Sequence, residues 1–302
     1  MRHLPREHAS LDVPGLGPVG LAIYGAEEGL PVLALHGAPA SRFMFELAHG
    51  PARELGLTLH CPDRPGYGAT PLDSTTRTLA TRAAGLARLA DALGLDRFAV
   101  LGISGGAPYA VALAAELGAR VSALALVSPM GPLADYLAAH PAAVAQGRVA
   151  RGHQVFFLSL PGHPRVLAAN AGMAAAAFRA APQVFTAAFV RSLSSADRAV
   201  LAKPENRRNL IRMTQEALRR GPDGALADHA LFARSWCLDP ARVTAKTVLW
   251  QGTADRIVPA AASFWLGERL PGCEVRRLDG HGHFWVYDEA ASVLATLQAL
   301  AA

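Results

Sequence analysis

The chain has 302 residues, of which 51% are apolar, so it is long enough to bury a large core as one domain or as a core domain that carries an insertion. Its formal net charge is +5, and its basic residues are almost all arginine, since Lys203 and Lys246 are the only lysines. The arginines are spread along the chain without a basic block or interleaved aromatic residues, which argues against a nucleic-acid-binding surface.

The cysteine content and the apolar windows bear on the compartment of the protein. Cys61, Cys237 and Cys273 are an odd number and lack the C-x-x-C spacing of a zinc or redox site, so we interpret them as free thiols in a reducing environment. Residues 1–8 carry charge, but no apolar stretch of secretory length follows them. The most apolar window, 98–115, is interrupted by glycines and a proline and does not fit a membrane span. We therefore expect a cytoplasmic protein.

The first half of the chain has the pattern of an α/β sheet. Several glycines and prolines in the first thirty residues suggest an antiparallel hairpin. Short apolar runs then alternate with helix-forming stretches, which is typical of a parallel sheet covered by helices on both faces. The expected strands span 30–36, 57–63, 98–103 and 121–127, and the expected helices span 41–55, 78–93 and 105–117.

The strand pattern disappears after residue 127 for about a hundred residues. Alanine- and arginine-rich stretches separated by prolines replace it, which indicates a helical insertion. Strands are expected again at 247–251 and 274–278, and a closing helix at 289–301. The sequence thus predicts an α/β core formed by 1–128 and 241–302, with 129–240 as a helical cap over one end of the sheet.

A glycine-flanked serine lies where an apolar strand meets a helix. The motif is Gly102-Ile103-Ser104-Gly105-Gly106, a match to G-x-S-x-G in the strand-to-helix context that the motif requires. A serine on such a tight turn has a strained backbone, and small neighbours leave space for it. The N-terminus of the following helix points its amides at the place where negative charge would develop on a carbonyl oxygen. We predict that Ser104 is a nucleophile.

A serine nucleophile requires a base and an acid that orients the base. Asp255 follows the strand expected at 247–251, and the carboxyl ends of parallel strands are where ligand sites form. His283 lies in the loop after the last expected strand and directly precedes a helix. His281 is a rival, but the position of His283 next to Phe284 favours an inward-facing imidazole. The chain order Ser, Asp, His fits the expected architecture.

A fourth element is the loop His36-Gly37-Ala38-Pro39 after the first parallel strand. Gly37 permits a sharp turn and Pro39 fixes the chain beyond it, so the Ala38 N–H can face the reaction centre. With the N–H of Gly105, it would supply two donors to an oxyanion. We interpret His36 as a brace for this loop, because it has no partners at metal-ligand spacing.

These motifs together resemble the α/β-hydrolase superfamily, within it the cap-bearing lineage with an H-G-x-P oxyanion loop. The resemblance rests on five segments: 36–39, Asp63-Arg64-Pro65-Gly66-Tyr67-Gly68, 102–106, 252–255 and 282–284. It implies a mostly parallel eight-stranded sheet flanked by helices, with an inserted helical cap. It also implies that the Asp63 segment is a structural turn and that no metal or organic cofactor is needed.

Members of the lineage with different activities differ in the nucleophile on the strand-to-helix turn, which is called the elbow. Epoxide hydrolases and haloalkane dehalogenases place an aspartate where this chain has Ser104, so the resemblance implies acyl transfer to serine and a carboxylic ester as the substrate. Proline iminopeptidases have a tryptophan-containing elbow, which this chain lacks. Two alternatives stay open: a C–C bond hydrolase or lyase that uses the same triad, and a receptor that holds a small ligand with little turnover.

The substrate depends on the insertion and is not identified by the sequence. Its aromatic residues could line an acyl pocket or pack the cap on itself. Met130, after the fourth parallel strand, and Phe284, beside the base, are the best-placed candidates for contact with a small-molecule substrate. The sequence does not distinguish a monomer from a homodimer.

Overall fold

The molecule is built on one eight-stranded sheet with the strand order β1-β2-β4-β3-β5-β6-β7-β8. The computed structural model describes residues 9–73, 75 and 77–302. The strands are β1 (Ala9–Val13), β2 (Gly17–Gly25), β3 (Leu30–Leu35), β4 (Leu57–Pro62), β5 (Phe98–Ile103), β6 (Val121–Val127), β7 (Lys246–Gly252) and β8 (Glu274–Leu278). β1 pairs with β2 and β2 with β4 in antiparallel fashion, and all pairs from β3 onward are parallel. The predicted fold class is confirmed.

The expected N-terminal hairpin is present as β1 and β2, with Ala9 opposite Leu21. The charged segment 1–8, on which the expectation of no export rests, lies outside the described residues. Along the part of the chain that is described, no helix is both long and apolar enough to cross a membrane. The three cysteines are free thiols.

The sheet changes its direction of growth at β3, which lies between β4 on one side and β5 on the other. Leu35 at the end of β3 is in register with Gly102 near the end of β5. In an open parallel sheet a crevice forms at such a switch point, outside the carboxyl ends of the two strands. The loops that follow β3 and β5 contain Ala38 and Ser104, so the fold brings these two segments together.

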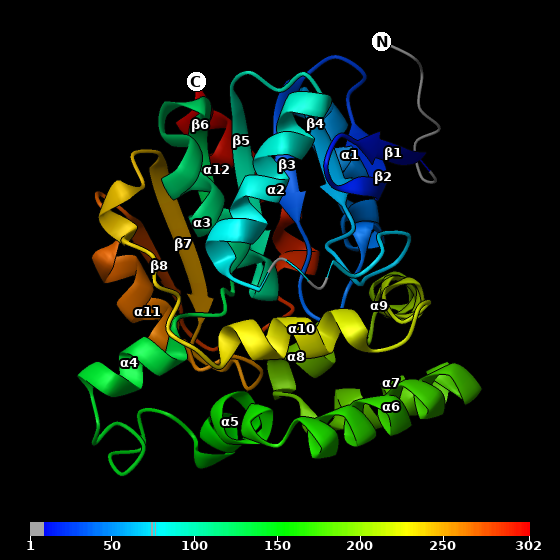
Figure 1. Ribbon diagram of the computed structural model, residues 1–302, viewed down its shortest axis with the longest axis vertical. Coiled ribbons are helices and arrows are strands. Elements are labelled where there is room, and N and C mark those ends of the chain that lie inside the picture. Colours follow the sequence, from blue (N-terminus) through cyan, green and yellow to red (C-terminus); the bar gives the residue numbers. More distant parts are fainter. Residues whose placement is uncertain (1–8, 74, 76) are drawn as a thin grey trace.

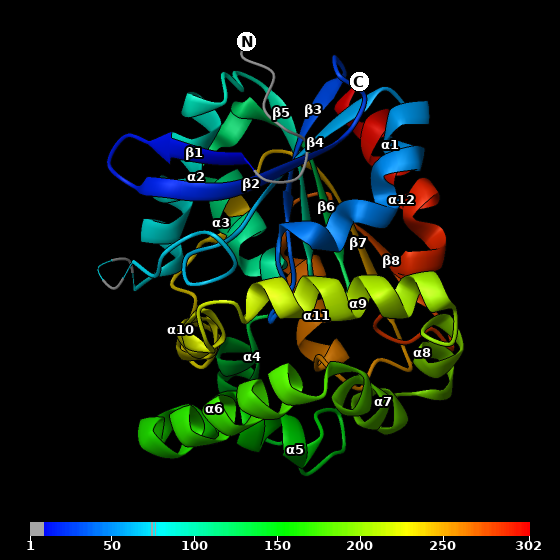
Figure 2. The ribbon, with the colours of Figure 1, turned by 90° about the vertical axis from the view of Figure 1, so that its right-hand side faces the viewer.

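Helices cover both faces of the sheet, and Figure 2 shows α1 and α12 on one side and α2 on the other. The helices outside the region between β6 and β7 are α1 (His49–Glu54), α2 (Leu79–Ala92), α3 (Ala107–Leu117), α11 (Ala260–Arg269) and α12 (Val286–Ala301). Successive residues of a strand point to opposite faces, so Leu33 and Leu35 pack with α2, α3 and α11. Val32 and Ala34 pack with α1 and α12 on the other face. Both faces are apolar, as a sheet buried between helix layers requires.

The segment between β6 and β7 is helical and gathers beyond one end of the sheet (Figure 1). We call this segment the insert. Its helices are α4 (Leu133–Ala139), α5 (Arg151–Gln154), α6 (Pro164–Ala180), α7 (Pro182–Ser192), α8 (Ser195–Val200), α9 (Pro204–Ala217) and α10 (Asp223–Phe232). The helical insertion expected from the sequence is therefore present, while the boundaries of the cap at 129 and 240 stay a prediction.

Two expected helices differ from the structure. The stretch 41–55 is a 3₁₀ segment, η1 (Arg42–Ala48), followed by the short helix α1. Pro51 lies in the first turn of α1, where its missing N–H is tolerated, but inside a longer helix it would break the hydrogen-bond ladder. The closing helix α12 begins at Val286 rather than at residue 289, and Glu289 has a non-helical backbone that kinks it.

Candidate active site

The elbow between β5 and α3 holds Ser104 in a strained conformation. Its φ is +53°, a region that residues with side chains rarely adopt, and its side chain is buried. The flanking glycines are required by space: a Cβ on Gly102 would lie 2.7 Å from the Ala110 Cβ, and a Cβ on Gly106 would overlap the Leu35 carbonyl oxygen. The sequence motif therefore has a steric cause, and the strain is of the kind found at functional sites.

Asp255 and His283 form a hydrogen-bonded pair at the ends of β7 and β8. The Nδ1 of His283 lies 2.7 Å from Oδ2 of Asp255, whose side chain is fully buried. The other carboxylate oxygen of Asp255 accepts hydrogen bonds from the N–H groups of Ile257 at 2.8 Å and Val258 at 3.1 Å. Because Asp255 accepts from Nδ1, the Nε2 of His283 is left free to accept a proton.

The pKa values of the pair move in opposite directions. Burial by itself would raise the pKa of Asp255, but the charge and hydrogen bond of His283 and the two loop N–H groups lower it below its usual value. Burial would lower the pKa of His283, but the attraction and hydrogen bond of Asp255, with a further contribution from the charge of Asp197, raise it. Asp255 is therefore ionised at neutral pH and stabilises an imidazolium on His283.

Ser128, at the end of β6, fixes the loop that carries His283. Its hydroxyl donates to the His283 carbonyl oxygen at 3.1 Å and accepts from the indole N–H of Trp285 at 3.0 Å. Its own N–H donates to the carbonyl of Trp250 at 2.8 Å. One buried serine thus connects β6, β7 and the loop after β8, and the orientation of the imidazole depends on it.

The loop after β3 is braced by His36 and Arg64, both of which are buried. The imidazole Nδ1 of His36 lies 2.8 Å from the Gly37 carbonyl, and its Nε2 accepts the Arg64 N–H at 3.0 Å. Burial and then the charge of Arg64 hold the pKa of His36 well below its usual value, so it stays neutral. A Cβ on Gly105 would lie 3.2 Å from the Ala38 nitrogen, so the Ala38 backbone lies beside the elbow.

A cavity of about 510 Å³ lies between these loops and the insert. Ser104, Ala38 and His283 line it, together with Phe284. Other lining residues come from the insert and are mostly aromatic or aliphatic, among them Phe156, Phe157, Phe178, Phe185, Phe189, Leu193, Leu210, Met213 and Phe232. Ser104 and His283, both described residues, face the same space without a hydrogen bond between their side chains in this structure.

The two substrate-pocket candidates have different positions. Phe284 lines the cavity and packs edge-to-face on the His283 ring, with 5.4 Å between the ring centroids. Met130, which we expected beside the substrate, is a described residue that does not line the cavity. Its side chain is buried in the core between the sheet and α3, and its N–H donates to the Ser104 carbonyl at 3.0 Å. The Met130 backbone, rather than its side chain, therefore contacts the elbow.

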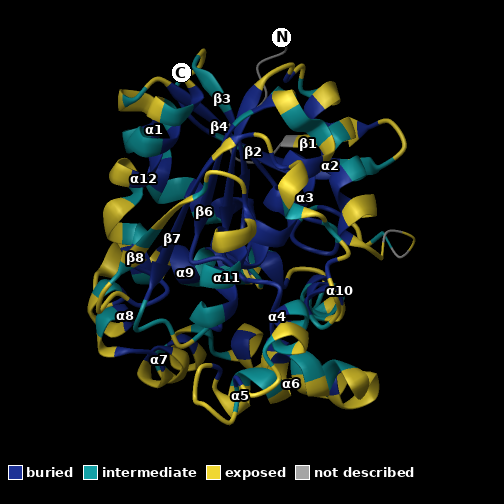
Figure 3. Cartoon of the chain, turned by 90° about the vertical axis from the view of Figure 1, so that its left-hand side faces the viewer, coloured by how far each residue is buried: buried dark blue, intermediate teal, exposed yellow. Residues whose placement is uncertain are grey.

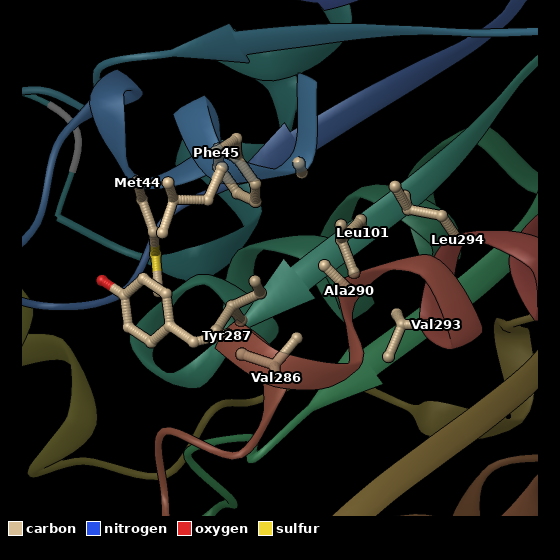
Figure 4. Close-up of a pocket in the computed structure, with 11 residues that line it drawn as sticks. Met44, Phe45, Leu101, Val286, Tyr287, Ala290, Val293 and Leu294 are labelled. Carbon is tan, nitrogen blue, oxygen red and sulfur yellow. The ribbon is translucent and has the colours of Figure 1, made fainter. Parts of the chain in front are cut away.

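A second, apolar pocket of about 40 Å³ lies behind the cavity, between η1, β5 and α12. Figure 4 shows Met44, Tyr287 and Val286 at one side of it and Leu294 at the other. The small pocket is separated from the main cavity by side chains that line both spaces, namely those of Met44, Ile103, Val286 and Tyr287.

The chain matches the model of the alpha/beta hydrolase fold family over residues 31–290. It belongs to this family. No curated protein matches it. Among solved structures, it resembles an alpha/beta hydrolase fold protein from Nakamurella multipartita, with 27% identity, a TM-score of 0.67 and coverage of 97% of this chain and 98% of the other.

Other solved structures resemble this chain at lower identity, and the likeness shows the fold. An esterase from Exiguobacterium antarcticum is 19% identical, with a TM-score of 0.68 and coverage of 97% and 99%. An epoxide hydrolase from Vigna radiata is also 19% identical, with a TM-score of 0.66 and coverage of 96% of both chains. The family membership indicates a hydrolase, and these relatives do not distinguish ester from epoxide substrates.

Three site residues of this α/β hydrolase were not found by sequence reasoning. Ser128 carries no motif. Asp197 and Asp228 lie in the insert, where the helical pattern does not indicate which polar residues face the core. Only the spacing of Ser194 and Asp197 carries a signal, since Ser-x-x-Asp is a helix-start pattern, and Ser194 does cap α8. Across the described residues no cluster of metal-ligating side chains is found, and the independence from cofactors stays a prediction.

Proposed function

We propose that the protein is a serine hydrolase that cleaves small carboxylic esters through an acyl-enzyme. The observation that carries the proposal is that Ser104 on its strained elbow and the Asp255-bonded His283 open into one apolar cavity. A serine hydroxyl needs such an oriented base to become a nucleophile at neutral pH.

In the proposed reaction, Ser104 Oγ attacks the ester carbonyl while its proton passes to His283 Nε2. The N–H groups of Ala38 and Gly105 stabilise the oxyanion, and one such donor typically contributes about 3 kcal/mol to transition-state stabilisation. The imidazolium then gives the proton to the leaving alcohol. A water molecule, activated by the same base, releases the acid and restores Ser104. The aromatic lining of the cavity supports a substrate with an apolar acyl or alcohol group.

Replacement of the nucleophile tests the proposal. Ser104→Ala is expected to lower kcat for p-nitrophenyl esters by at least about 10³-fold and to abolish labelling by a fluorophosphonate. Ser292→Ala is the matched control, because Ser292 is an exposed serine on α12, and it is expected to label and turn over like the parent. Ester turnover by Ser104→Ala at the parental rate would refute the mechanism.

A substrate panel separates the alternatives. Parent protein that hydrolyses esters but not β-diketones or epoxides supports the proposal. Ser104-dependent cleavage of β-diketones without ester turnover would assign the site to C–C bond hydrolysis. Tight binding of a small apolar ligand without any turnover would assign it to a receptor.

A further inference from the structure

A buried carboxylate from the insert lies outside the Ser-His-Asp constellation. Asp197, on α8, has no exposed surface. A buried carboxylate is normally paired with a cation, because burial of an isolated charge is costly. Among the described residues, none of the ion pairs involves Asp197. The Asp197 carboxyl group is thus held in the interior without a cationic partner among the described residues.

The contacts of Asp197 run to the loop that carries the base. Its Oδ1 accepts the N–H of Phe284 at 2.7 Å, and its Oδ2 accepts the hydroxyl of Ser194 at 2.7 Å. A Cβ on Gly282 would overlap the carboxylate, so the absence of a side chain there lets Asp197 approach the backbone. Gly282 and Phe284 precede and follow His283 in the sequence. The Asp197 carboxylate therefore contacts the backbone on both sides of His283.

We propose that Asp197 is a positioning residue through which the insert both fixes the backbone of His283 and supplies a second negative charge to the imidazolium that forms during catalysis. This inference rests on the proposed function. The proton taken from Ser104 Oγ resides on His283 Nε2 in the tetrahedral intermediate, while Asp255 holds Nδ1 and Asp197 contacts the backbone next to the base. The charge balances within the site without any further reactant.

The other titratable groups around the base do not replace this charge. Those that line the same cavity are Arg256 after β7, His153 on α5, His229 on α10 and Tyr287 on α12. On the side of α8, the Arg198 guanidinium donates to the Leu193 carbonyl at 2.7 Å, and Lys203 pairs with Asp288 at 2.8 Å. Only the charges of Asp255 and Asp197 raise the pKa of His283.

The sign of the pH effect follows from this arrangement. The base must be neutral to accept a proton, so kcat/KM rises with pH through the pKa of His283 in the free enzyme. Asp197 favours the charged imidazolium and so raises that pKa. Removal of the charge lowers the pKa and moves the acid limb of the kcat/KM profile to lower pH.

Asp197→Asn tests this inference, because asparagine keeps the size of the side chain and an acceptor for the Phe284 N–H but has no charge. We expect the acid limb of kcat/KM to move down by about 0.5 to 1 pH unit and the plateau to fall about three- to tenfold. The matched control is Asp288→Asn, which removes a partly exposed carboxylate that pairs with Lys203, and the acid limb of this variant is expected to stay in place.

A titration of His283 makes the result independent of turnover. All proteins in this experiment carry Ser104→Ala. The NMR signal of the His283 ring proton is assigned by its loss in His283→Gln. The pKa of the imidazole is then measured with Asp197 in place and after Asp197→Asn or Asp197→Ser. A lower pKa in Asp197→Asn supports the inference, and Asp197→Ser, which adds no volume against Gly282, must give the same direction. Equal pKa values with aspartate, asparagine and serine at position 197 would overturn the inference. A lower melting temperature of Asp197→Asn with an unchanged acid limb of kcat/KM would overturn it as well. Failure of ester turnover in the parent protein would refute the proposed function alone.

Discussion

The two sides of the insert are attached to the rest of the molecule by different means. Helices α8, α9 and α10 contact the sheet and its loops through buried polar groups. Asp197 accepts the N–H of Phe284 in the loop that carries His283, and Asp228 forms an ion pair with Arg64 at 2.6 Å. Helices α6 and α7 make no such contact: within the described residues, the side-chain hydrogen bonds from these two helices stay inside the same helix. Their outer surface is exposed in Figure 3 and includes Val184, which is 71% exposed.

From this difference we expect that one side of the cavity is fixed in one geometry, while the other side is adaptable and tolerates repacking. Charged and hydrogen-bonded contacts specify one geometry, because a displaced buried charge has no alternative partner. Apolar contacts are less directional and tolerate repacking. The loops that carry Ser104 and His283 thus lie on the fixed side, and the aromatic residues of α6 and α7 that line the cavity, such as Phe178 and Phe185, lie on the adaptable side.

The largest effect on stability is expected where α10 meets α3 and the segment after β4. Asp228 accepts hydrogen bonds from Arg64, Tyr67 and Tyr109, and all four residues are buried. Asp228→Asn leaves the Arg64 charge uncompensated and is expected to lower the free energy of unfolding by about 3–5 kcal/mol, measured by urea denaturation.

The matched control is an exposed pair. Asp91 contacts Arg120 at 2.7 Å, but its side chain is 60% exposed, so Asp91→Asn is expected to cost less than about 1 kcal/mol. Equal losses in Asp228→Asn and Asp91→Asn would show that the buried contact does not fix this side of the insert.

An intermediate effect on stability is expected where α8 meets the loop that carries His283. Gly282→Ala places a methyl group against the Asp197 carboxylate and is expected to destabilise the protein by about 1–3 kcal/mol, as overpacking does. The thermal midpoint and ester turnover should both fall. Unchanged values for both would mean that α8 moves freely relative to the loop and that the contact is not tight.

The smallest effect, with the opposite sign, is expected on the adaptable side. Gly172 lies inside α6 with open space around its α-carbon. Gly172→Ala is expected to raise the free energy of unfolding by up to about 1 kcal/mol, because alanine favours the helix and meets no neighbour. A calorimetric melt measures it, and a destabilisation comparable to that of Gly282→Ala would remove the contrast between the two sides.

Much of the fold could be predicted because local signals and topology agree. Apolar runs mark the strands, and their alternation of faces, as in Leu33 and Val32, matches the two cores. The helix expected over 41–55 was wrong in its first half, because Pro51 has no N–H with which to continue a helix from the preceding turn. The carboxyl ends of the strands converge by topology, so Ser104 and His283 could be expected to share one cavity.

The rest of the site depends on contacts that no local pattern encodes. The sequence around Asp197 indicates only the start of a helix capped by Ser194. The tertiary structure is needed to show that the Asp197 carboxylate faces Gly282 rather than water. Met130 was expected at the substrate because it follows a strand end, but its side chain packs in the buried core, after a turn in which Ser128 has a positive φ. Whether a side chain after a strand end faces the cavity or the core depends on the backbone direction, which the composition does not encode.

The insert leaves the sheet after Val127 and returns at Lys246, on the neighbouring strand, and the pairing of β6 with β7 is made by strand residues alone, from Ala123 opposite Lys246 to Val127 opposite Trp250. A segment joined to a scaffold at two points, here the carboxyl end of one strand and the amino end of its parallel neighbour, can change in length and sequence without a shift of register. The region between these points is therefore a natural cassette: exchange of α6 and α7 between homologues, with α8 to α10 retained, should alter the range of accepted substrates while the chemistry at the strand ends is inherited unchanged.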